Sequence, residues 1–132
     1  MQFVPLLNAS VPIKVHVASV ALVIGLTPFQ LLLQRGGAWH RAIGKIWMVA
    51  MALTALSSFF ISTIHMFGPF SPLHLLAVIS LVCLVLAYRA ARRGDAVSHA
   101  WTMTSLTLFA LLVPGVFTLW PGRIMNAVLL GP

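Results

Sequence analysis

The chain has 132 residues, of which 61% are hydrophobic and only 7% are charged. Soluble domains carry about 25% charged residues because their surface must face water, so eight Lys or Arg and one acidic residue cannot cover a water-facing globule of this length. The composition therefore excludes a soluble domain and predicts an integral membrane protein, and because the cations lie beside apolar stretches, we expect anionic membrane lipid rather than nucleic acid as their partner.

Four apolar stretches are long enough to cross a bilayer as helices, which takes about 20 residues each. In chain order, the predicted spans cover residues 11–34, 38–66, 72–93 and 96–120. Backbone polar groups in hydrocarbon must hydrogen-bond within the protein, which favours helices for all four stretches. The connections are short, so consecutive helices should pack antiparallel. We therefore predict an all-α membrane protein in which residues 1–132 form one domain, an antiparallel four-transmembrane-helix bundle.

Local signals mark the ends of the predicted spans. Pro12 suits the first turn of the first span, where its missing N–H costs nothing. Gly94 is a candidate left-handed cap at the end of the third span. Asp95 is a candidate N-cap of the fourth span, with Ser98 three residues on, and Pro114 is expected to kink that span. We read no cleaved signal peptide and expect the first span to remain as an anchor.

Cations are distributed unevenly between the two ends of the spans. The connections after the first and third spans, with their flanks, hold six of them: Arg35, Arg41, Lys45, Arg89, Arg92 and Arg93. The opposite ends hold Lys14 and Arg123. Because cytoplasmic loops of membrane proteins are enriched in Lys and Arg, this asymmetry predicts that both termini and the turn between the second and third spans lie outside the cytoplasm.

The five histidines sort into two layers when the four spans are folded antiparallel. His16, His65 and His74 come together near the outer face, and His40 and His99 near the cytoplasmic face. Each neutral imidazole has one donor and one acceptor, and a polar group left unpaired in hydrocarbon costs several kcal/mol. A metal or haem iron would satisfy the acceptor nitrogen, and a backbone carbonyl or hydroxyl the donor.

The depth of the histidines in the membrane limits how many of them need a metal or haem ligand. His40 and His65 are predicted on one helix and would lie about 37 Å apart along it. That distance exceeds the hydrocarbon core, which is about 30 Å thick. At least one of the two rings is therefore expected at the wet interface, where it needs no ligand.

Several segments resemble a family of small predicted bacterial inner-membrane proteins that is labelled only as a domain of unknown function. They are HRAIGKIWMVAMALTALSSFFI (40–61), GPFSPLHLLAVISLV (68–82), AARRGDAVSHAWTM (90–103) and FTLWPGRIM (117–125), and HVASVALVIGLTPFQ (16–30) is similar to the opening segment of the family. The resemblance covers nearly the whole chain and implies a four-helix protein of the bacterial inner membrane, without an established reaction. The family usually has a basic residue directly after the histidine of the fourth span, where this chain has Ala100.

The layered histidines also resemble, in architecture and residue type, the two-haem transmembrane b-type cytochromes, which hold bis-histidine haem near each membrane face. This resemblance implies that His40 and His99 bind one haem b and His16 and His74 a second, with Arg41, Lys45, Arg92 or Arg93 pairing the propionates. Gly44 and Ala77 would leave room for the macrocycles. The implied function is electron transfer between membrane quinol and an acceptor.

Other interpretations remain open. His16, His65 and His74 provide three imidazoles, enough for zinc or copper at the outer face, and Met66 would favour copper(I). A non-catalytic packing or assembly protein would use the rings to hydrogen-bond the backbone. A transporter would lack intramembrane carboxylates and would need a homo-oligomer to form a pathway. Hydrolytic chemistry is disfavoured because Asp95 supplies the only carboxylate side chain.

Overall fold

A computed structural model of the protein describes residues 2–61 and 72–131. All regular secondary structure in these two ranges is helical, which confirms the predicted all-α class. The elements are α1 (Val4–Leu7), α2 (Val11–Leu32), α3 (Ala38–Ser58), α4 (Pro72–Arg92), α5 (Ala96–Leu106), the π-helical segment η1 (Thr107–Leu112), α6 (Val113–Thr118) and α7 (Ile124–Leu130).

Three helical segments of the described chain are long and apolar enough to cross a membrane. They are α2, α4 and the continuous rod formed by α5, η1 and α6, which runs from Ala96 to Thr118. Helix α3 is similar in length but does not reach the same hydropathy. Arg41 and Lys45 near its N-terminal end account for the difference, because charged side chains strongly lower the hydropathy of a helix.

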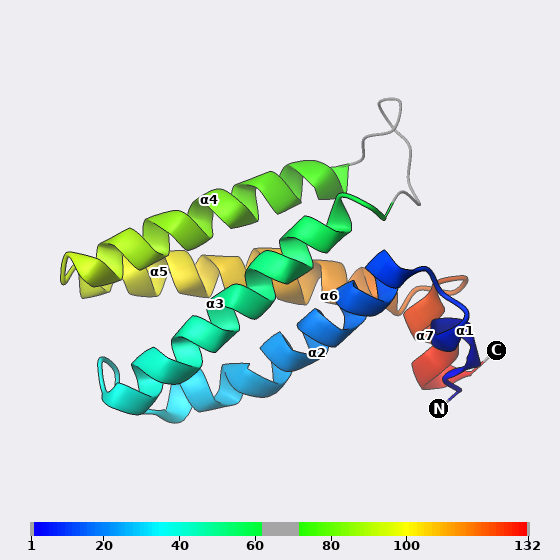
Figure 1. Ribbon diagram of the computed structural model, residues 1–132, viewed down its shortest axis with the longest axis horizontal. Helices are drawn as coiled ribbons and strands as arrows, with labels where there is room; N and C mark the ends of the chain where they lie inside the picture. Colours follow the sequence, from blue (N-terminus) through cyan, green and yellow to red (C-terminus); the bar gives the residue numbers. More distant parts are fainter. Residues whose placement is uncertain (1, 62–71, 132) are drawn as a thin grey trace.

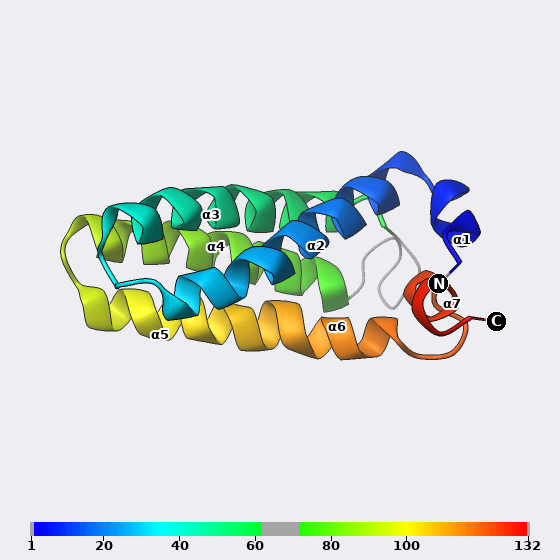
Figure 2. The ribbon, with the colours of Figure 1, turned by 90° about the horizontal axis from the view of Figure 1, so that it is seen from below.

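The long helices lie side by side, and each packs against the next along the chain (Figures 1 and 2). Helices α2 and α3 form one hairpin, α4 and α5 form another, and α3 contacts α4 between them. The short helices α1 and α7 contact each other at one end of the molecule, where the backbone N–H of Gln2 donates to the carbonyl of Val128 at 2.9 Å. The chain termini therefore lie together at that end.

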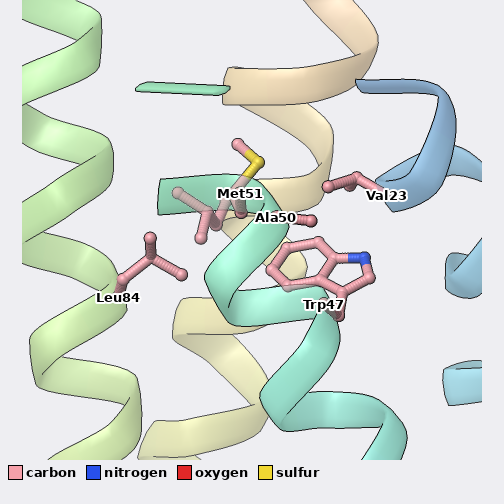
Figure 3. Packing of buried hydrophobic residues seen from close by; sticks show 6 residues of the cluster. Val23, Trp47, Ala50, Met51 and Leu84 are labelled. Carbon is pink, nitrogen blue, oxygen red and sulfur yellow. The ribbon is translucent and has the colours of Figure 1, made fainter. Parts of the chain in front are cut away.

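A cluster of buried side chains joins the two hairpins (Figure 3). Its members are Val23 from α2, Trp47, Ala50 and Met51 from α3, Leu84 from α4 and Leu106 from α5. In lipid, helices associate through close packing rather than through hydrophobic burial. The alternation of large and small residues in this cluster lets α3 approach both neighbouring helices.

Helix α3 ends at Ser58, whereas the sequence predicted a span continuing to Met66. The hydroxyls of Ser57 and Ser58 donate to carbonyls three residues earlier in the chain, at 3.0 Å and 2.6 Å. Serine side chains compete in this way with the backbone bonds of a helix. The following N–H groups, from Phe59 to Ile61, then bond three residues back instead of four, which tightens the chain into a turn. The rest of the predicted turn, including His65, lies outside the described residues.

The fourth predicted span is helical through Thr118 but widens in its middle. The backbone N–H of Val113 donates to the carbonyl of Leu108, five residues earlier. Pro114 follows directly, and a proline ring inside a helix clashes with the carbonyl four residues before it. The π-helical segment η1 therefore absorbs the distortion that the sequence predicted as a kink.

The turn between α4 and α5 has the geometry that the sequence predicted. Gly94 has φ of +74°, in the left-handed region. The backbone N–H of Asp95 donates to the carbonyl of Ala90 at 2.9 Å and that of Gly94 to the carbonyl of Ala91 at 3.1 Å, the two bonds of a Schellman motif. The Asp95 carboxylate then accepts from the backbone N–H of Ser98 at 3.0 Å and caps α5.

The Asp95 cap makes a pH-dependent contribution to stability. Hydrogen bonds from Ser98 lower the pKa of the Asp95 carboxyl below its ordinary value. A carboxyl with a lower pKa in the folded state stabilises the fold above its unfolded pKa and loses that contribution as the pH falls. We expect the melting temperature of the purified protein to fall between about pH 5 and pH 2, and the fall to be smaller in Asp95→Asn, whose amide oxygen caps without titrating. Equal falls in both proteins would contradict this role.

Candidate functional site

His99 lies in the first turn of α5, directly after the capped turn at Gly94 and Asp95. Its Nδ1 lies 2.9 Å from the carbonyl oxygen of Ala87 in α4. Ala87 is fully buried, and its small side chain lets the ring reach the backbone of α4. Because a carbonyl can only accept, Nδ1 carries the proton and Nε2 keeps its lone pair. This tautomer is the one that a metal-binding histidine usually adopts.

His40 lies in the first turn of α3 at the same end of the molecule. Its ring is close enough to that of His99 for the two to interact electrostatically. The Nδ1 of His40 is buried and has no hydrogen-bond partner within the described residues. A buried nitrogen left unpaired costs about 1–3 kcal/mol. The ring also has a hydrogen bond with the backbone of Gln30, so Nδ1 alone is the position that a ligand could complete.

The space beside Gly44 is already occupied. The Nε2 of Gln30 donates to the carbonyl of His40 at 3.1 Å, and a Cβ added at Gly44 would lie 3.1 Å from that same Nε2. The sequence predicted that Gly44 would leave room for a flat macrocycle. The structure instead shows that Gly44 makes room for the amide of Gln30, which needs a partner in an apolar environment.

At the other end of the molecule, His16 and His74 both contact the C-terminal part of α3. The Nδ1 of His16 lies 3.0 Å from the carbonyl oxygen of Thr54 and 3.1 Å from the hydroxyl of Ser57. The Nε2 of His74 lies 3.1 Å from the carbonyl oxygen of Phe59, whose ring centroid is 5.7 Å from that of His74. Each ring therefore donates to the backbone of α3 or of the turn that follows it. The shared site that the sequence predicted for the two rings stays a prediction.

The predicted three-histidine metal site depends on a residue outside the described chain. His65 belongs to the undescribed range 62–71. In the rest of the chain, no group of three or more His, Cys, Asp or Glu side chains could hold a metal ion. The zinc or copper site of His16, His65 and His74 therefore stays a prediction.

Sequence reasoning located the histidines but missed their partners. Thr54, Phe59 and Ala87 accept through backbone carbonyls, which every residue possesses, so no residue type marks them. Ser57 carried a usable signal, because its hydroxyl lies on the same side of α3 as Thr54, three residues earlier.

Comparison with known proteins gives one result. A family model described as "Predicted membrane protein (DUF2306)" matches residues 11–126, from the first residue of α2 into α7. No curated protein and no solved structure gives a significant match. The family match agrees with the apolar helices in indicating a membrane protein.

Proposed function

The chain belongs to the family of predicted membrane proteins described as DUF2306, and from the arrangement of His40 and His99 we propose that it is a small four-span haem b protein. In this proposal it passes electrons between membrane quinol and an acceptor. The proposal has three parts: a fourth helix that crosses the membrane, the orientation of the protein in the membrane, and the residues that bind haem.

The fourth crossing is assigned to α3. This helix packs between α2 and α4, each long and apolar enough to span a membrane, and has 21 residues against their 22 and 21. A helix that packs along two membrane-crossing neighbours shares their depth. The cation-rich connections after α2 and α4 face the cytoplasm by the positive-inside rule, which puts both termini outside, in a bacterial inner membrane.

One observation carries the haem proposal: the ring of His99 is held as a potential iron ligand. Its bond to the Ala87 carbonyl fixes the tautomer and leaves the Nε2 lone pair available. His40, which lies at the same end of the molecule and has an unpartnered buried Nδ1, is the proposed second ligand. Arg41, exposed beside His40, is the proposed partner of a propionate. When bound, haem b supplies reversible one-electron chemistry.

We limit the proposal to one haem. His16 and His74 both donate to backbone carbonyls, those of Thr54 and Phe59. The buried ring nitrogen that has no hydrogen-bond partner within the described residues belongs to His40, at the opposite end of the molecule. A second haem between His16 and His74 therefore has weaker support than the site at His40 and His99.

A second candidate function is packing or assembly without a cofactor. Three rings join neighbouring segments by donating to backbone carbonyls: His16 to Thr54, His74 to Phe59 and His99 to Ala87. Such interhelical bonds contribute about 0.6 kcal/mol each on average in membrane proteins. In this case no haem would bind, so one measurement separates the two candidates.

The deciding measurement is a reduced-minus-oxidised absorption spectrum of the detergent-purified protein, recorded after expression with haem supplementation. We expect a Soret band and the split visible bands of a low-spin b-type haem, with close to one haem per chain. A protein that is folded by circular dichroism but shows no Soret band would overturn the haem proposal and leave the packing function.

A further inference from the structure

An open hollow of about 440 Å³ lies between α2 and α3. Its volume falls within the range of about 300–1,000 Å³ that is common for small-molecule sites. Apolar side chains line most of it, among them Leu22 on α2 and Val49 and Leu53 on α3. Small side chains at Ala18 and Ser19 deepen it on the α2 side. None of the lining residues is a histidine, so the hollow is separate from the proposed haem site.

One charged residue, Lys45, lines this hollow. It lies about 10 Å along α3 from Ala38, the first residue of the helix, so its flexible stem can carry the ammonium group toward the membrane surface. Within the described residues no acidic side chain pairs with it, because Asp95 is the only acidic residue of the chain and it caps α5. The anion that balances Lys45 must therefore come from outside the protein.

We propose that the hollow between α2 and α3 binds one anionic phospholipid, with its phosphate on Lys45 and an acyl chain along Leu22, Val49 and Leu53. Charge complementarity selects the headgroup, because a lipid phosphate is the abundant anion at the depth that the lysine can reach. The apolar side chains that line the hollow favour the acyl chain of the lipid. Outside the hollow, that acyl chain would pack less closely against the exposed faces of α2 and α3. The binding does not depend on the proposed haem.

The test measures lipid bound to the intact protein by native mass spectrometry after delipidation. Phosphatidylglycerol and phosphatidylcholine with identical acyl chains are added in separate titrations. One lysine near the surface contributes about 1 kcal/mol toward an anionic lipid, so we expect phosphatidylglycerol to bind about fivefold more tightly. In Lys45→Met the two lipids should bind equally, and in Ala18→Phe, which fills the hollow, both should bind more weakly.

Two matched variants control for general effects on charge and shape. Lys14→Met removes an exposed lysine that does not line the hollow, and Ala21→Phe enlarges an exposed alanine of the same helix outside it. Both should bind lipid as the wild type does. Equal binding of the two lipids by the wild type, or equal losses in Lys45→Met and Lys14→Met, would overturn the proposal. A lipid-free dimer disrupted by Ala18→Phe would also overturn it, because a second copy would then cover this face.

Discussion

Replacing His99 with alanine is expected to abolish the b-type absorption of the protein, and His40→Ala is expected to do the same. These two rings are the groups that would hold the iron, and a low-spin b-type spectrum would require both. His99 is held for this role by its Nδ1 bond to Ala87, at 2.9 Å. The measurement is the reduced-minus-oxidised spectrum of each purified variant, with haem content per chain.

The control is His16→Ala, because His16 also donates from Nδ1 to a carbonyl of a neighbouring helix, at 3.0 Å. Removing either ring should lower stability by a similar amount, about 0.6 kcal/mol and at most about 1.7 kcal/mol. Only the His99 variant should lose the spectrum. Added imidazole should restore it in part, since the free base can occupy the vacated position. A His99→Ala protein with an unchanged spectrum would refute His99 as a ligand.

The helical architecture could be predicted because it depends on local sequence. Apolar runs of sufficient length give α2 and α4, and the capped turn at Gly94 and Asp95 follows from backbone geometry that those two residue types favour. The end of α3 could not be predicted from hydropathy alone. It depends on whether Ser57 and Ser58 turn their hydroxyls back onto the helix or outward, and hydropathy does not distinguish these two orientations.

The candidate site could be predicted only in part. The placement of His40 with His99, and of His16 with His74, follows from antiparallel packing of helices of known length. Which ring nitrogen carries the proton depends on a carbonyl of another helix, and the sequence contains no signal for that contact.

Gly44 is a second feature whose structural role the sequence alone does not determine. A glycine one turn from a histidine fits either a bound macrocycle or an inserted side chain. In the structure the side chain of Gln30 occupies this space, and Gln30 lies fourteen positions earlier in the chain, on another helix. Side-chain insertion between helices depends on their separation and rotation, which sequence spacing alone does not determine.

Replacing Trp47 with alanine is expected to produce the largest loss of stability among single substitutions in the described core. Trp47 is only 2% exposed and is the largest member of the cluster that joins the two hairpins. Truncating a buried tryptophan to alanine typically costs about 3–5 kcal/mol. In lipid this cost comes from lost close packing, which is the main force that holds transmembrane helices together. The measurement is the free energy of unfolding in mixed micelles titrated with a denaturing detergent.

The polar part of the Trp47 contact can be separated from its packing. The indole N–H of Trp47 donates to the hydroxyl of Thr27 at 3.0 Å, and that hydroxyl itself donates to the carbonyl of Val23 at 2.7 Å. Thr27→Val removes the acceptor and keeps the shape, so we expect a loss nearer 0.6 kcal/mol, the average for such bonds in membrane proteins. A double-mutant cycle of Thr27→Val with Trp47→Phe isolates the bond, because Phe keeps an aromatic ring there without a donor. If Trp47→Ala cost no more than Thr27→Val, the hydrogen bond between α2 and α3 would account for the contribution of Trp47 to stability, and packing around the indole would contribute little.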